Sequence, residues 1–200
     1  MTAVDRDRMV IESVMPDFDA RIAEHVVVAA NPAATFGAAR RLDFLTVHTP
    51  LLAASMWIRG LPQRLRGRCA PPPSRLVLGQ GMGLPGWVLL GERPDREVAF
   101  GAVGRFWQPT ITWRDVPQSQ FRDFVEPGWG KIAANFTVMP YGEHSALLSY
   151  ECRTVTTDAA SRRKFLRYWW LIRPFVGHIM RATLSTIRAD AESANALRSR

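Results

Sequence analysis

Residues 165–187 read FLRYWWLIRPFVGHIMRATLSTI, and this stretch decides the fold. Apolar side chains recur in it at steps of three and four residues, which places them on one face of a helix. This apolar stripe consists of Phe165, Trp169, Ile172, Val176, Ile179, Thr183 and Ile187. Asp158 caps the predicted helix, which runs to about residue 190, and Pro174 lies inside it and must bend it. Such a helix needs a sheet against which to bury its apolar face.

The sequence before this helix predicts an antiparallel sheet. Strands are expected at residues 21–30, 87–92, 97–107, 110–114, 130–139 and 145–157, with an irregular or helical stretch at 118–125. In 130–139 the apolar residues alternate with polar ones, so one face should be buried and the other should meet water. The apolar set is Ile132, Ala134, Phe136 and Val138.

The region after the first strand predicts two short helices. Asn31 is an N-cap followed by Pro32 at the first helical position, and the helix should reach about residue 42. A second helix is expected at 50–65, followed by a long loop at 66–86. The fold class is therefore α+β: a curved antiparallel sheet of about six or seven strands wrapped around a long C-terminal helix. Residues 1–19 are expected to be irregular, 20–190 to form one ligand-binding domain, and 191–200 to be a flexible tail.

The charge of the chain is concentrated in two segments. The net charge is +8, with five arginines and no acid in residues 59–75, and seven bases with one acid in 158–188. A basic surface of this kind could bind an anionic membrane or nucleic acid. Solvated helix faces are the simpler interpretation. The basic segments lack the alternating aromatic platforms of single-strand binders, which argues against nucleic acid.

Several classes of protein are disfavoured by what the sequence lacks. Residues 1–10 are charged and no apolar segment follows them, and no run of eighteen apolar residues exists, so we expect a cytoplasmic protein without a transmembrane segment. Cys69 and Cys152 have no metal-ligand spacing and are interpreted as free thiols in a reducing compartment. The four histidines are scattered, so no metal and no cofactor are expected.

Four local strings, in this order, carry a resemblance to a known superfamily. They are GWVLLGE (86–92), GAVGRFW (101–107), YECR (150–153) and RYWWLIRPF (167–175). Together with the Asn31-Pro32 helix, they resemble the START-like polyketide cyclase (SRPBCC, helix-grip) superfamily over about residues 20–190, most closely a mostly uncharacterised bacterial branch. The resemblance implies a cavity for an apolar or aromatic molecule between sheet and helix. Members of the superfamily transfer lipids, bind hormones, or cyclise and dehydrate polyketides.

Candidate ligand-binding residues come from the strands and from the long helix. Arg105 and Trp107 share a face of their strand, where a guanidinium could anchor a carboxylate or enolate and a ring could stack. The alternative is that Arg105 pairs with Glu151 at the sheet surface. Tyr168 flanks the apolar stripe and could orient the polar end of a ligand. The full candidate set is Arg105, Trp107, Trp113, Phe136, Tyr150, Tyr168, Trp169 and Arg173.

The position of Glu151 bears on whether the chain is an enzyme. In the last strand the residues of the opposite parity are the more apolar set, so Glu151 should point outward, away from the cavity. We therefore favour a non-catalytic carrier of a small apolar, aromatic or lipid-like molecule. The alternative is a cyclase or dehydratase in which Arg105 or Tyr168 polarises the substrate, and a second alternative is a basic face that binds membrane or nucleic acid. Trp170 and Leu171 fall outside the stripe and could pack under residues 59–75 or form a homodimer contact.

Overall fold

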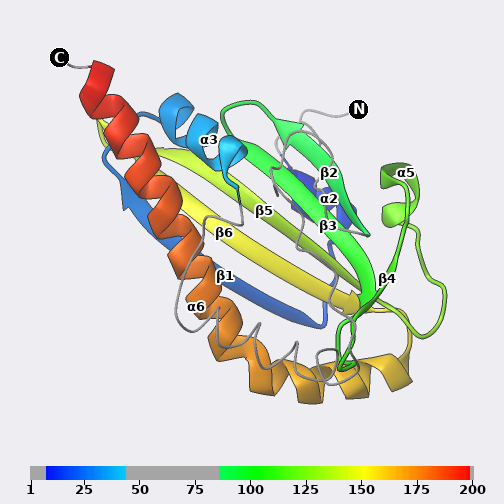
Figure 1. The fold of residues 1–200 in the computed structure, drawn as a ribbon. Helices are drawn as coiled ribbons and strands as arrows, with labels where there is room; N and C mark the ends of the chain where they lie inside the picture. The colour runs from blue at the N-terminus through cyan, green and yellow to red at the C-terminus, as the bar shows by residue number, and fades with distance from the viewer. Residues whose placement is uncertain (1–7, 44–85, 199–200) are drawn as a thin grey trace, which may run out of the picture.

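The computed structural model describes residues 8–43 and 86–198, which form a sheet and four helices around it. The strands are β1 (Ala20–Val28), β2 (Trp87–Arg93), β3 (Glu97–Arg105), β4 (Thr112–Arg114), β5 (Gly130–Tyr141) and β6 (Ser145–Thr156). They pair antiparallel in the order β1-β6-β5-β3-β2, and β4 pairs with β3. The long helix α6 (Ala159–Arg198) runs diagonally across one face of this curved sheet (Figure 1). The expected helix-grip fold and its number of strands are confirmed.

Alternate residues of the central strands face opposite sides of the sheet. Even-numbered residues of β1, β3, β5 and β6, such as Phe100 and Phe136, share a cluster with α6, and we call this side the inner face. Odd-numbered residues, such as Ala99 and Ala133, belong to a second cluster on the outer face. The predicted direction of the apolar set in 130–139 is confirmed, because Ala134, Phe136 and Val138 are buried in the inner cluster.

Two helices cover the inner face. Helix α3 (Pro32–Arg41) begins as predicted, with the Asn31 side chain accepting a hydrogen bond of 2.8 Å from the backbone amide of Ala34. It packs in the inner cluster with Leu184 and Ile187 of α6. The stripe on α6 faces inward as predicted, but the helix continues to Arg198, beyond the expected end. Residues 191–198, for which a tail was expected, are therefore part of this helix.

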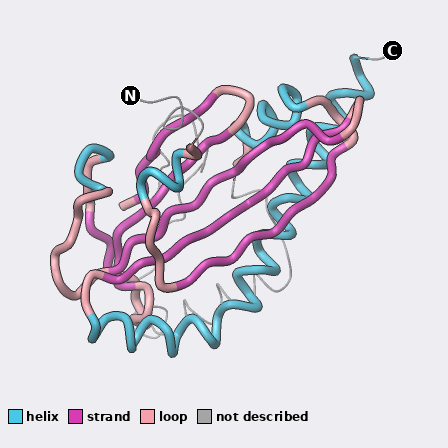
Figure 2. The backbone as a smooth tube through the Cα atoms, turned by 180° about the vertical axis from the view of Figure 1, so that it is seen from behind, coloured by secondary structure: helices cyan, strands magenta, loops and turns pink. Residues whose placement is uncertain are grey.

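The outer face is covered over β2, β3 and much of β5, which differs from the expectation that it would meet water. Helix α2 (Val10–Val14) and the short α5 (Gln118–Phe121) lie on it, and Figure 2 shows α2 on the side opposite α6. Consequently Lys131 and Asn135 are only 8% and 2% exposed. The expectation that residues 1–19 are irregular is wrong for 10–14, because their apolar side chains have a face of the sheet to pack against.

Helix α2 is fixed at both ends by charged side chains of the sheet. The fully buried carboxylate of Glu97 accepts hydrogen bonds from the backbone amides of Val10 and Ile11 and, at 2.6 Å, from the side-chain amide of Asn135. At the other end, the guanidinium of Arg153 donates to the carbonyl of Met15 at 2.9 Å. The first helix of the chain is therefore an integral layer of the fold.

Several expectations lie outside the described residues. These are the helix at 50–65, most of the loop at 66–86 and the basic segment 59–75. Within the described residues, no helix is both long enough and apolar enough to cross a bilayer. α6 has the length but carries eight Lys and Arg residues.

Candidate ligand-binding site

A row of aromatic rings crosses the inner face of the sheet. Trp87 of β2 lies 5.9 Å from Phe100 of β3, which lies 5.8 Å from Phe136 of β5, and Phe136 lies 4.5 Å from Tyr150 of β6. Trp113 of β4 extends the row, 6.0 Å from Trp87. Offset and tilted ring pairs at these centroid distances attract one another beyond their burial. The face that meets α6 therefore presents a continuous aromatic wall drawn from five strands.

Small side chains lie beside this wall at one place. The strand register puts Ala134 directly between Phe100 of β3 and Cys152 of β6, and Ile22 of β1 follows Cys152. Neighbouring side chains on one face of a sheet are about 5 Å apart, so small residues fill less of the space beside Phe100 than large ones would. Ala134 is 1% exposed and belongs to the inner cluster, and Cys152 packs against that cluster. We call this place, formed by Ala134 and Cys152 between Phe100 and Ile22, the trough.

The polar groups at the trough are neutral. Burial raises the pKa of the Cys152 thiol to about 12, with a further contribution from the charge of Glu151. Burial likewise raises the pKa of Tyr150 above its ordinary value. Both groups stay protonated at neutral pH, so neither is a thiolate nucleophile or a phenolate base. Among the described residues the Tyr150 hydroxyl has no hydrogen-bond partner, which leaves it able to donate to a bound molecule.

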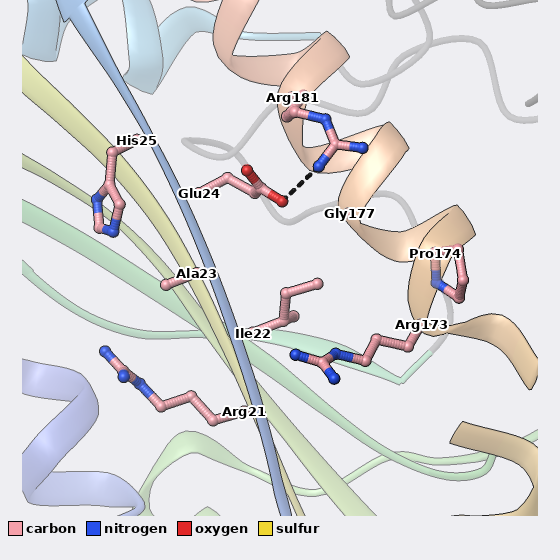
Figure 3. A pocket seen from close by; sticks show the side chains of 9 residues that line it. All are labelled: Arg21, Ile22, Ala23, Glu24, His25, Arg173, Pro174, Gly177 and Arg181. Atoms are coloured by element: carbon pink, nitrogen blue, oxygen red, sulfur yellow. Dashed lines mark hydrogen bonds and ion pairs between the residues drawn. The ribbon is translucent and has the colours of Figure 1, made fainter. Parts of the chain in front are cut away.

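An open groove of about 760 Å³ lies at the edge of the sheet, between β1 and α6. Glu24 of β1 and Arg181 of α6 form an ion pair of 2.7 Å across it (Figure 3). Gly177 allows the helix to come this close, because an added Cβ would lie 3.2 Å from the Glu24 carboxylate and 3.4 Å from Ile22. The groove is lined by residues 21–25 and by Arg173, Pro174, Gly177 and Arg181.

The groove and the trough share a wall. Ile22 pairs with Cys152 across the strands, and Glu24 pairs with Tyr150. The Arg173 side chain reaches toward Ile22 from the helix, as Figure 3 shows, and has no ion-pair partner among the described residues. A molecule that enters from the sheet edge would thus meet a cation first and aromatic side chains further in.

The structure brings some of the predicted site residues together. Trp113, Phe136 and Tyr150 all belong to the aromatic row, and Arg173 lines the groove. In the first part of α6 lie half-buried Tyr168 and also Trp169, whose ring stacks on Phe165 with centroids 6.0 Å apart. Trp107 lies in the turn after β3, against Gly130.

Arg105 occupies the wrong face for a pocket residue. Its guanidinium lies 4.4 Å from the centroid of the Trp129 ring, on the outer face, and donates to the carbonyl of Gly128 at 3.1 Å. The alternative expectation, an ion pair with Glu151, is also wrong. The cause is the parity of β3, in which the odd-numbered residues turn away from α6.

Glu151 faces outward, as its parity predicted. It forms ion pairs with Arg21 at 2.7 Å and with Arg153 at 2.6 Å. Burial alone would raise the pKa of Glu151, but hydrogen bonds from these two guanidinium groups lower it below its ordinary value. The carboxylate is therefore ionised at neutral pH and lies on the face opposite the trough.

Sequence reasoning missed Trp87, Phe100 and Cys152 at the inner face, and the ion pair between Glu24 and Arg181. Strand β3 is buried on both faces from Glu97 to Gly104, so its side chains show no polar alternation from which a direction could be read. The pairing of Glu24 with a residue of the last helix is a contact between the two ends of the chain. Local sequence patterns carry no signal for such a contact.

Within the described ranges, no group of three or more histidine, cysteine or acidic side chains could hold a metal ion. The chain matches no family model, and no curated protein matches it. Solved structures are similar at low identity. A protein of Chromobacterium violaceum is 15% identical, over 89% of this chain and 99% of that chain, with a TM-score of 0.37.

Two further structures have assigned names. Truncated norcoclaurine synthase from Thalictrum flavum is 12% identical, over 84% of this chain and 91% of that chain, with a TM-score of 0.38. The Zhui aromatase/cyclase of a Streptomyces species is 11% identical, over 86% and 93%, with a TM-score of 0.31. Likeness at this level assigns neither ligand nor reaction to the chain, because one fold supports many functions.

Proposed function

We propose that this protein binds a small apolar or aromatic molecule in the trough on the inner face of its sheet. The observation that carries the proposal is the aromatic row, which borders the small side chains of Ala134 and Cys152. Ligand sites in proteins are typically apolar and aromatic, with few polar groups that fix orientation. Here the Tyr150 hydroxyl, which has no partner among the described residues, would be such a group, donating a hydrogen bond to a carbonyl, ether or hydroxyl oxygen of the ligand.

The chemistry of the wall favours a carrier over an enzyme. General acid–base catalysis needs a group whose pKa lies near the working pH and which reaches the substrate. Burial raises the pKa values of Tyr150 and Cys152 further above neutral pH. Glu151 lies on the outer face of the sheet, opposite the trough. A cyclase or dehydratase reaction is the second candidate, because a neutral Tyr150 hydroxyl could polarise a substrate carbonyl. Arg105, the other candidate for polarising the substrate, lies on the outer face and does not reach the trough.

The test fills the trough and compares it with a matched change outside it. The probe is N-phenyl-1-naphthylamine, an uncharged aromatic dye whose fluorescence rises in apolar surroundings. Ala134→Phe should lower its affinity at least tenfold, because the new ring occupies the space between Phe100 and Cys152. Val27→Phe, on the outer face of β1 and outside the groove, is the control and should bind the dye as the wild type does.

A second variant guards against a folding defect, since Ala134 is only 1% exposed. Tyr150→Phe keeps the ring and removes the hydroxyl. It should leave binding of the dye unchanged, while it weakens a ligand that carries a carbonyl. If folded Ala134→Phe protein binds the dye with wild-type affinity, the trough is not the site. Native mass spectrometry of the freshly purified protein, with solvent extraction, would then identify any ligand that is bound elsewhere.

A further inference from the structure

The first part of α6 exposes large apolar side chains on its solvent side. Trp170 is 82% exposed and Leu171 is 63% exposed, and Phe175 and Leu166 are 41% and 38% exposed. Single exposed apolar residues are ordinary on protein surfaces, but four within ten residues of one helix are not. We call this set, Leu166, Trp170, Leu171 and Phe175, the apolar ridge. The segment of α6 that carries it, residues 166–175, lies along the margin of the described fold, where the helix bends (Figure 1).

Cations are interleaved with the apolar ridge. Arg163, Lys164 and Arg167 are exposed in the same part of the helix, and none has an ion-pair partner among the described residues. No acidic residue occurs between Asp158 and Asp190. Arg163, Arg167 and Trp170 follow one another at steps of four and three, so they share one helical face. The surface is thus apolar and cationic at once.

We propose that this face of α6 docks on the surface of an anionic lipid bilayer. A bilayer interface offers both kinds of partner, since acyl chains take up the Trp, Leu and Phe side chains while anionic headgroups meet the arginines. Trp in particular partitions to the boundary between headgroups and hydrocarbon. The long Arg side chains can extend from an inserted helix face toward the headgroups.

Two other partners fit this face less well. A second copy of the chain, docked through the same face, would bring the cations Arg163, Lys164 and Arg167 against the same three of its partner, and like charges in an interface are costly. A single-stranded nucleic acid would satisfy the cations and could stack on the rings of Trp170 and Phe175, but it would leave the aliphatic side chains of Leu166 and Leu171 in water. The bilayer is the partner that accounts for both chemistries, and the proposal does not depend on what the trough binds.

The experiment is flotation of the full chain with vesicles of phosphatidylcholine alone, or of phosphatidylcholine and phosphatidylglycerol at a 7:3 ratio. We expect binding to the anionic vesicles, little binding to the neutral ones, and a loss of binding as salt is raised. Trp170→Ala should lower the partition coefficient at least tenfold. Arg163→Gln with Arg167→Gln should lower it about 25-fold, because each basic residue near an anionic surface contributes about fivefold.

Matched variants elsewhere on the surface serve as controls. Tyr141→Ala removes an aromatic ring that is 55% exposed at the far end of β5, and Arg122→Gln with Arg188→Gln removes two exposed charges outside the face. Neither should change vesicle binding. The proposal is overturned if Trp170→Ala floats like the wild type, or if the chain ignores anionic vesicles. It is equally overturned if the wild-type chain does not bind vesicles but forms a dimer that Trp170→Ala dissociates. The same holds if the wild-type chain binds a single-stranded oligonucleotide instead, and Trp170→Ala weakens that binding.

Discussion

Replacing Glu97 by Ala should release helix α2 from the outer face of the sheet. The Glu97 side chain is fully buried, and its two carboxylate oxygens accept the amides of Val10 and Ile11 and the side-chain amide of Asn135. Alanine cannot accept any of these hydrogen bonds. Three donors would then be left unpaired in a site from which water is excluded, unless the helix moves away.

The loss of stability in Glu97→Ala is set by the cheaper of two responses: α2 stays in place with unpaired donors, or α2 detaches. A hydrogen bond to a charged group contributes about 1.5–3 kcal/mol, so keeping α2 in place with three unpaired donors would cost several kcal/mol. Detaching α2 instead exposes Ile11 and Met15, both 2% exposed in the native protein, at about 1.5–3 kcal/mol each. The released segment regains conformational freedom, which offsets part of that cost. We expect the free energy of unfolding to fall by about 3 kcal/mol, with α2 detached.

Urea unfolding measures the change in the free energy of unfolding, and hydrogen exchange at the amides of Val10 and Ile11 reports whether α2 has detached from the sheet. Limited proteolysis should also cut the variant before residue 20. The control is Glu92→Ala, which breaks a surface ion pair with Arg40 of 3.3 Å and should cost less than about 1 kcal/mol. Unfolding free energy within about 0.5 kcal/mol of wild type, together with unchanged exchange in α2, would refute the role assigned to Glu97.

Three further predictions concern acid stability, packing and thiol reactivity. Hydrogen bonds led by the Ser161 backbone amide lower the pKa of Asp158 to about 2, so its stabilisation is present above pH 4 and is lost as pH falls toward 2. Urea unfolding of Asp158→Asn should therefore depend less on pH in that window; an unchanged profile would contradict this. Gly101→Ala should destabilise by roughly 2 kcal/mol or more in the same assay, since its Cβ would lie 2.6 Å from a backbone oxygen of β5, and near-neutral stability would be the contrary result. In a Cys69→Ser background, Cys152 should resist thiol reagents at pH 7 because its pKa is raised to about 12; rapid labelling of the native protein would show otherwise.

Regular periodicity made the inner side of the fold predictable. The spacing from Phe165 to Ile187 located the face of α6, and the alternation in 130–139 correctly turned Ala134 and Phe136 inward. The cap at Asn31 is a local hydrogen bond, so its signal is contained in four residues of sequence. These features depend on neighbours along the chain, which is where sequence patterns are informative.

The outer side of the fold was not predictable in the same way. Val10, Ile11 and Val14 form too short a run to indicate a helix, and their helix is held by Glu97, far away along the chain. Lys131 and Asn135 lie in a strand that looks amphipathic, yet they are buried on the outer face. The helices that cover this face are distant in sequence, so the local pattern of the strand gives no sign of them. In β3, burial of both faces removed the alternation that would have placed Arg105 on the outer face.

The pairing of β1 with β6 has a consequence for how the protein is made. Within the described sheet, β1 pairs with β6 alone. During synthesis, β1 must therefore wait for its partner: Val28 has none until Ala146 has been added, and Ala20 has none until Thr154 has been added. At ordinary rates of translation, that wait lasts roughly 5–25 s. During this time a valine-rich strand emerges from the ribosome with no partner for its backbone. Chaperone capture of nascent chains should therefore be strongest before the last strand is synthesised, and should fall once it has left the exit tunnel.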